Sequence, residues 1–201
     1  MNDHFAALDL PRRPWLDPEE IQRRFHDASS AAHPDRQSQG RDAPEGASSA
    51  LFQEINAAYQ VLRDPVSRMQ HFLELENGVA GSVVEQTPSS LVDTFLDVGA
   101  ILQRLDRDIA ECREAPSPML KALKAQGVFD GVDAAVSLQG QLETRIEGLM
   151  VQTKDWDQEF GASDRDSDGL SALEGIYREW RYLARWLEQL QERVFSANGL
   201  L

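Results

Sequence analysis

The sequence predicts an all-α protein. Nearly every long segment spaces its apolar residues three and four apart, and no stretch sustains the apolar–polar alternation of a half-buried strand. Proline, glycine and short polar stretches separate these segments, which marks where the helices begin and end. The chain has 201 residues, enough for one large domain or two small ones.

The N-terminal part is expected to contain a helical hairpin. Helices are predicted at 2–8, 17–33, 48–62 and 64–76, with a loop at 37–47. The second helix has the clearest start, because Asp17 is a good N-cap, Pro18 suits the first helical position, and two glutamates follow in the first turn. Its apolar face carries Ile21 and Phe25.

The C-terminal part is expected to form a three-helix bundle. Long helices are predicted at about 89–113, 130–160 and 169–195, with a short helix around 119–123 that ends at Gly127. Narrow apolar stripes on helices of this length favour near-antiparallel packing around a shared core. The domain boundaries that follow are 1–76 for the N-terminal domain, 77–88 for a linker and 89–201 for the bundle.

The charge and cysteine content narrow the range of partners. The formal net charge of −14 argues against nucleic acid and against an anionic membrane surface. Residues 1–75 hold 8 Lys and Arg against 12 Asp and Glu, and residues 76–201 hold 12 against 22, so the rest of the chain is the more acidic part. Cys112 is the only cysteine, which leaves no disulfide framework. With no signal-like or membrane-length apolar run, the expected location is cytoplasmic.

The tripeptide His33-Pro34-Asp35 follows the second predicted helix. Proline has a fixed φ and no backbone N–H, and it pushes the preceding residue out of the α region, so the helix is expected to stop at His33. An imidazole and a carboxylate are then held at a rigid corner beside an amphipathic helix. Such a corner suits contact with another protein better than chemistry on a small molecule.

The two helices with His-Pro-Asp between them resemble the J domain, the DnaJ-type module that stimulates the ATPase of a DnaK-type chaperone. The downstream run Ile55-Asn56-x-Ala58-Tyr59-x-x-Leu62-x-Asp64-Pro65-x-x-Arg68 resembles the third helix of that domain and its exit. The resemblance implies that Asp35 accepts a charge-assisted hydrogen bond from an arginine of the chaperone, with His33 as an orienting donor and Pro34 as a strut. Further chaperone contacts are expected from Arg23, Arg24 and Arg36.

The chain is most similar to the HscB-type co-chaperones of iron–sulfur cluster assembly, in its opening Asp3-His4-Phe5-x-x-Leu8-x-Leu10-Pro11 and in Trp180-Arg181-Tyr182-Leu183. This implies an HscA-type chaperone as partner and the iron–sulfur scaffold protein as client. The family's client face lies on the first bundle helix, where the corresponding apolar residues are Leu91, Val92, Phe95 and Leu96. Two features depart from the family pattern. The helix before His33 is poorer in basic residues than most J domains, and the acidic part of the client face is reduced to Asp93 and Asp97.

The sequence leaves two other interpretations of the function open. One is a general J-domain protein with a different client. The other is a calcium-binding module, since residues 164–175 imitate an EF-hand loop, but the twelfth position is Gly175 instead of glutamate. An acidic helix start capped by Asp166 or Asp168 explains the same residues.

The remaining motifs predict neither an enzyme nor a cofactor or metal site, because no nucleophile, base or metal-ligand cluster has workable spacing. The histidines at 4, 26 and 71 are expected at the surface or its boundary, and the tryptophans at 156, 180 and 186 in the core. Trp15 is expected to pack on the N-terminal helices. Exposed aromatic surface on the last helix would allow a weak homodimer.

Overall fold

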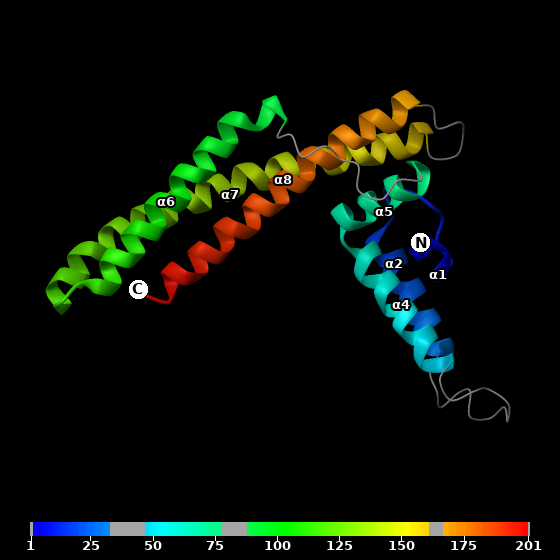
Figure 1. Ribbon diagram of the computed structural model, residues 1–201, viewed down its shortest axis with the longest axis horizontal. Helices are drawn as coiled ribbons and strands as arrows, with labels where there is room; N and C mark the ends of the chain where they lie inside the picture. Colours follow the sequence, from blue (N-terminus) through cyan, green and yellow to red (C-terminus); the bar gives the residue numbers. More distant parts are fainter. Residues whose placement is uncertain (1, 33–46, 78–87, 161–166, 201) are drawn as a thin grey trace. The chain divides into compact units, whose positions relative to one another are not determined.

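The computed structural model describes residues 2–32, 47–77, 88–160 and 167–200, and these are helical apart from short connections. In chain order the elements are α1 (His4–Ala7), α2 (Pro18–Ala32), α4 (Ala47–Arg63), α5 (Pro65–Asn77), the 3-10 turn η1 (Ser89–Leu91), α6 (Val92–Glu114), α7 (Pro118–Phe160) and α8 (Ser167–Asn198) (Figure 1). No strand occurs among the described residues, so the predicted all-α class is confirmed.

The chain forms two compact units, and each of them is built from two separate stretches of the sequence. The N-terminal unit comprises Met1–Val83 and Thr153–Tyr177, and the bundle unit comprises Val84–Gln152 and Arg178–Leu201. Helices α7 and α8 therefore each contribute residues to both units. The expected domain boundaries, with a linker at 77–88 between 1–76 and 89–201, stay a prediction.

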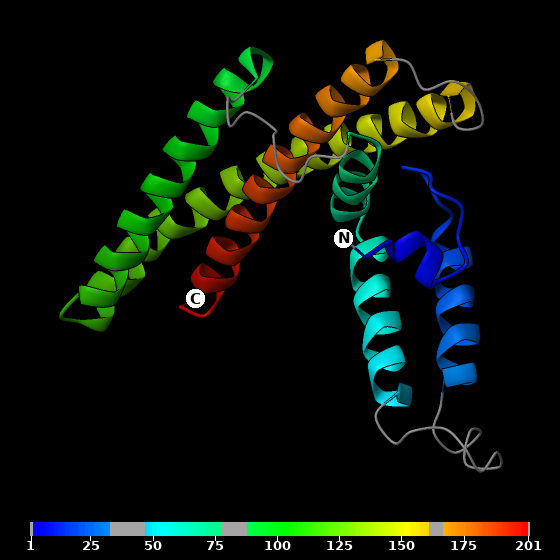
Figure 2. The same ribbon diagram turned by 45° about the vertical axis from the view of Figure 1, so that its right-hand side comes forward.

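In the N-terminal unit, α2 and α4 lie side by side as a hairpin (Figure 2). Helix α2 begins as predicted, since the Glu19 N–H donates to the Asp17 carboxylate at 2.9 Å. The rings of Phe25 and Tyr59 stack across the hairpin with centroids 4.1 Å apart. Apolar side chains from three helices are buried beneath them, among them Phe5, Leu8, Ile21, Ile55, Ala58 and Leu62.

Helix α5 is joined to the hairpin by a buried arginine. Asp64 caps the helix by accepting from the Ser67 N–H at 2.7 Å. One turn later the Arg68 guanidinium, only 5% exposed, donates to the carbonyl oxygens of Pro14 at 3.0 Å and Leu62 at 2.6 Å. Burial lowers the pKa of Arg68 to about 10, although the nearby Asp64 charge opposes the shift. Arg68 thus links α5, the end of α4 and the segment before α2.

The ends of α7 and α8 complete the N-terminal unit. Trp156 of α7 packs edge-on against Phe72 of α5 with centroids 5.9 Å apart, and its indole N–H donates to the Gly169 carbonyl at 2.7 Å. The buried Asp157 carboxylate lies 3.5 Å from the Arg13 guanidinium. The Lys154 ammonium sits 4.8 Å from the centre of the Trp15 ring. The core position predicted for Trp156 is confirmed, and the partner of Trp15 includes α7, which the sequence did not indicate.

In the bundle unit, α6, α7 and α8 run alongside one another (Figure 1). Helix α7 is antiparallel to α6, since Glu111 pairs with Lys124 while Arg104 approaches Asp130 at 3.9 Å. Helix α8 is parallel to α6 and antiparallel to α7, with contacts that join Asp106 to Arg193, Arg113 to Ser196 and Arg145 to Glu179. The expected three-helix bundle is confirmed, and Trp180 and Trp186 are buried in it as predicted.

The predicted break at Gly127 is wrong, because α7 continues from Pro118 to Phe160 without interruption. Gly127 and Gly131 instead lie where α7 approaches α6 closely. A Cβ atom at Gly127 would meet the Asp108 side chain at 3.5 Å, and one at Gly131 would lie 2.9 Å from the Leu105 Cδ1 atom. A glycine costs a helix interior about 1 kcal/mol relative to alanine, and tertiary packing routinely outweighs that preference. These glycines mark a helix contact and not a helix end.

Candidate functional site

Helix α2 carries two of the predicted chaperone-binding residues, Arg23 and Arg24, near its middle. It ends at Ala32, immediately before His33, as expected from the proline that follows. Figure 2 shows the last turn of α2 and the first turn of α4 at the same end of the hairpin. His33, Pro34, Asp35 and Arg36 lie outside the described residues, so their contacts with a chaperone stay a prediction.

The two described arginines of this predicted site both have carboxylate neighbours. Arg23 is exposed and lies 3.3 Å from Glu20, its neighbour one turn earlier. Arg24 pairs with Asp9 at 2.7 Å and lies 3.9 Å from Glu20. Exposed pairs of this kind contribute roughly 0–1 kcal/mol, so a partner can replace them at little cost. The positive potential of the helix is nevertheless reduced, which agrees with its low content of basic residues.

The start of α4 exposes two large apolar side chains, Leu51 and Phe52. Their spacing of four and three residues from Ile55 favours a place in the buried stripe of this helix, but they are 44% and 41% exposed. The buried residues of α4 begin one turn later, at Ile55. These two side chains lie in the second turn of α4. Periodicity alone could not detect their exposure, because it depends on where the opposing helix ends.

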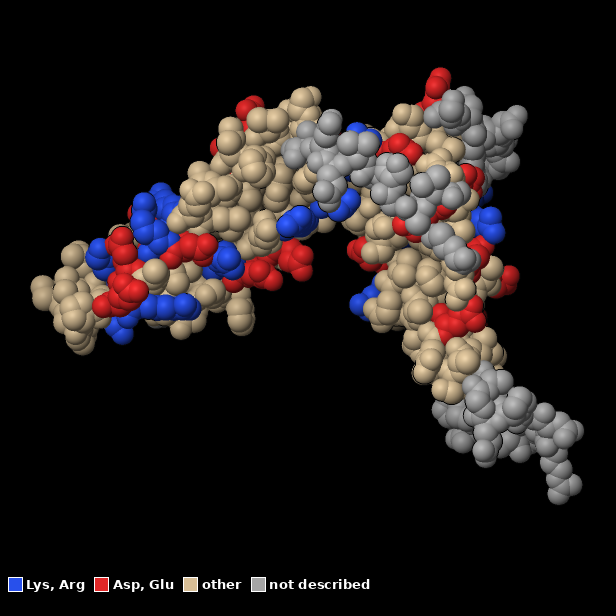
Figure 3. Space-filling view, in the orientation of Figure 1, with Lys and Arg blue, Asp and Glu red and all other residues tan. Residues whose placement is uncertain are grey.

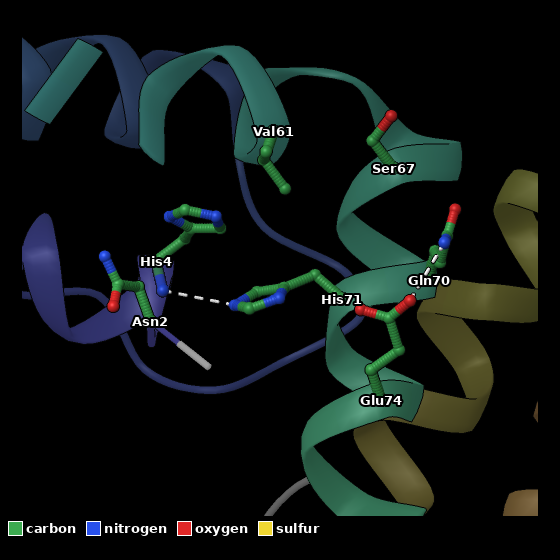
Figure 4. Close-up of a pocket in the computed structure, with 7 residues that line it drawn as sticks. All are labelled: Asn2, His4, Val61, Ser67, Gln70, His71 and Glu74. Carbon is green, nitrogen blue, oxygen red and sulfur yellow. Dashed lines mark hydrogen bonds between the residues drawn. The ribbon is translucent and has the colours of Figure 1, made fainter. Parts of the chain in front are cut away.

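A pocket of about 300 Å³ lies between α1 and α5 (Figure 4). The His4 backbone N–H donates to His71 Nε2 at 3.1 Å, and the two imidazole rings are 4.6 Å apart. Burial, and then the neighbouring His4, lower the pKa of His71 below its ordinary value. The boundary position expected for His71 is wrong, since the residue is only 4% exposed. His71 accepts a backbone hydrogen bond here, so it acts as a link between α1 and α5.

Helix α6 divides into an apolar half and a charged half. Residues 92–103 include two charged side chains, and residues 104–114 include seven. In the first half Val92, Phe95 and Leu96 are 45%, 53% and 60% exposed. Figure 3 shows the result, with a largely tan surface over the N-terminal half of α6 and blue and red atoms crowded over the part of the bundle toward its C-terminal end.

Leu91 differs from the other three residues predicted for the client face. It lies in η1, one residue before α6 begins, and its side chain is completely buried. Leu91 therefore packs in the core and is not part of the exposed surface of this face. Across the bundle, the Phe95 ring contacts that of Trp186 on α8 with centroids 6.1 Å apart. We use the name α6 face for Val92, Phe95 and Leu96.

The EF-hand interpretation of residues 164–175 does not fit the structure. Residues 167–175 form the first two turns of α8, with Asp168 in the first turn, so most of the proposed loop is helix. Asp166 lies outside the described residues. Among the residues that are described, no three His, Cys, Asp or Glu side chains come together as a metal site would require. Within the same ranges, no helix is both long enough and apolar enough to cross a membrane.

Comparison with known proteins identifies the family. The DnaJ domain model matches residues 3–71. The chain is 31% identical over 200 residues to the co-chaperone protein HscB of Proteus mirabilis, covering 96% of this chain and 98% of that protein. The chain belongs to the HscB family of co-chaperones. An HscB homolog of Ralstonia nicotianae is 30% identical over 147 residues, covering 73% of this chain and 74% of the relative.

Two solved HscB structures share the fold. Chaperone HscB from Vibrio cholerae has a TM-score of 0.61 at 18% identity and covers both chains completely. Human co-chaperone protein HscB has a TM-score of 0.58 at 20% identity, covering 95% of this chain and 81% of the human one. The J-domain and HscB resemblance seen in the sequence is confirmed, and the relatives are named as co-chaperones and not as enzymes.

Proposed function

We propose that this HscB-family chain stimulates the ATPase of a DnaK/HscA-type chaperone through His33, Pro34 and Asp35. The observation that carries the proposal is the position of this tripeptide within the DnaJ-domain match, directly after the last residue of α2. Asp35 accepts a hydrogen bond from an arginine of the chaperone, and Pro34 fixes the corner. Arg23, Arg24 and Arg36 add exchangeable charge contacts. Hydrolysis takes place in the chaperone, so this chain needs no catalytic group.

The second half of the proposal concerns the client. The α6 face presents three large apolar side chains to solvent on a half-helix with few charges. Exposed apolar patches of this kind mark sites of protein contact. We assign this face to the client and propose that the client is the iron–sulfur scaffold protein. The alternative within the same class is a general J-domain protein whose bundle holds a different client.

The chaperone half is tested by the ATPase activity of a purified HscA-type chaperone in the presence of wild type, Asp35→Ala and Asp133→Ala. Asp133 is an exposed aspartate on α7, which makes it a matched control for the loss of one carboxylate. We expect Asp35→Ala to abolish stimulation while its circular dichroism matches the wild type. Full stimulation by Asp35→Ala would show that the tripeptide does not act as a J-domain contact.

The client half is tested by calorimetric titration of the full chain with purified scaffold protein. Phe95→Ser combined with Leu96→Ser should weaken binding at least tenfold, since truncating a central interface residue commonly costs more than 1 kcal/mol. The control is Met119→Ser with Leu123→Ser, a second exposed apolar pair on α7, at 85% and 71% exposure. Failure of the scaffold protein to bind the wild type would favour the general J-domain alternative.

Two narrower expectations also remain proposals. The cytoplasmic location is still an inference from the sequence. A weak homodimer also stays a prediction, and sedimentation of the wild type at increasing concentration would test it. A constant monomer mass up to about 100 µM, well above the micromolar Kd of a modest complex, would contradict self-association.

A further inference from the structure

Within the described ranges, three arginines on α8 have no ion-pair partner. Arg178, Arg181 and Arg185 form no hydrogen bond or ion pair among the described residues. Most other cationic side chains in the bundle unit do have such partners: Arg104, Arg107, Arg113, Lys124, Arg145 and Arg193. In a chain with a net charge of −14, three neighbouring cations without a carboxylate are unexpected.

Among the described residues, the acids on α8 that lie near these arginines form no ion pair with them. Glu179 is within reach along α8 but is held by Arg145 of α7 at 2.6 Å. Glu188 follows Arg185 by three residues, and the described part of the chain shows no ion pair between them. Arg181 and Arg185 are exposed and four residues apart, a spacing at which like charges on a helix repel each other. The repulsion between Arg181 and Arg185 is therefore unfavourable for the isolated helix α8.

These cations adjoin the α6 face through a row of aromatic rings. Tyr182 lies four residues after Arg178 and three before Arg185, so the three share one side of α8. The Tyr182 ring is 5.8 Å from that of Trp186, and Trp186 in turn contacts Phe95 at 6.1 Å. All of these residues belong to the bundle unit. The buried Trp186 ring and the half-buried Tyr182 ring thus connect Phe95 of the α6 face with the part of α8 that carries Arg181 and Arg185.

We propose that the partner docked on the α6 face is acidic where it meets α8, with surface carboxylates that pair with Arg181 and Arg185. This inference rests on the proposed client function and specifies the chemistry of the client. The apolar side chains contribute burial, and the guanidinium groups contribute fork-shaped donors that match carboxylates. Because the three cations have no partners among the described residues, binding a carboxylate breaks no ion pair with that part of the chain.

The experiment compares the full-length wild type with the double variant Arg181→Gln and Arg185→Gln, titrated calorimetrically with purified scaffold protein at 50 and 300 mM salt. We expect the variant to bind about tenfold more weakly at low salt, as two exposed ion pairs would give. Its affinity should also depend less on salt than that of the wild type, because charges across the interface are screened. The matched control is Arg104→Gln with Arg107→Gln, two arginines in the charged half of α6 that pair with Asp108.

The possible results distinguish a failure of the acidic-partner inference from a failure of the proposed client function. If the arginine variant and the wild type bind equally at both salt concentrations, while Phe95→Ser with Leu96→Ser abolishes binding, the client face stands and the acidic-partner inference is wrong. If the control weakens binding as much as the test variant, the effect is general charge attraction and the inference also fails. If the scaffold protein does not bind the wild type at all, the proposed client is wrong, and this inference falls with it.

Discussion

Gly131 and Gly140 of α7 offer a test of how closely the bundle helices pack. Both lie inside the same helix. A Cβ atom added at Gly131 would lie 2.9 Å from the Leu105 Cδ1 atom and 3.8 Å from its Cβ atom, whereas one added at Gly140 would meet nothing within 4 Å. Leu105 is completely buried, so its side chain has little room to move away. Replacement by alanine should therefore stabilise the protein at Gly140 and not at Gly131.

The magnitudes follow from two terms. Alanine gains about 1 kcal/mol over glycine in a helix interior, and this gain applies at both sites. Overpacking a closed contact costs about 1–3 kcal/mol, and this cost applies only at Gly131. Gly140→Ala is expected to raise the free energy of unfolding by about 1 kcal/mol. Gly131→Ala is expected to leave it unchanged or lower it by up to about 2 kcal/mol.

Guanidinium and thermal unfolding followed by circular dichroism would measure both variants against the wild type. For a chain of this size, a change of 1 kcal/mol moves the Tm by about 2–4 °C. Gly140→Ala should therefore melt a few degrees higher than wild type, and Gly131→Ala at the same temperature or lower. Equal stabilisation by both substitutions would refute the close approach of α7 to Leu105.

Two further predictions concern the N-terminal unit. Burial, and then His4, lower the pKa of His71, so the unfolded chain binds a proton at this imidazole more readily than the folded chain does. The contribution of His71 to the free energy of unfolding should therefore be fully present above pH about 6.5 and fall as the pH drops below it. Urea midpoints between pH 5 and 8 should show this slope in wild type and a smaller one in His71→Gln; an unchanged slope would exclude His71 as the source. Arg68→Met should lower the free energy of unfolding by about 2–4 kcal/mol, since it leaves two backbone carbonyls without their buried donor. A loss below about 0.5 kcal/mol, the usual range of surface substitutions, would show that the guanidinium is dispensable.

The start of helix α2 was predicted correctly because only a few neighbouring residues determine where a helix begins. The start of α2 depends on Asp17 and Pro18 alone, and the observed hydrogen bond to the Asp17 carboxylate follows from that pair. The continuity of α7 could not be predicted in this way. Gly127 favours a helix end by its intrinsic propensity, but its neighbour across the bundle is Asp108, nineteen residues away in the sequence. A contact of that kind is decided by tertiary packing.

The α6 face shows the same limit. The sequence pattern could place Val92, Phe95 and Leu96 on a helix, but it could not distinguish them from Leu91, which the 3-10 turn directs into the core. The sequence likewise shows that α8 contains Arg178, Arg181 and Arg185, but it does not predict that they lack ion pairs among the described residues. Their significance depends on which acidic side chains approach them, and the pairing of Glu179 with Arg145 joins two helices.

The division of α7 and α8 between two units bears on how such a chain can be recombined. A J domain is often regarded as a module that can be moved by exchanging one continuous segment. Here residues 1–77 would leave behind Trp156, which covers Phe72, and Asp157, which pairs with Arg13. A fusion made at residue 77 would expose aromatic surface and leave an arginine without its partner. A graft of this domain should therefore include residues Thr153–Tyr177, from the end of α7 and the start of α8, together with the N-terminal helices. We expect these two stretches to be exchanged between proteins only together.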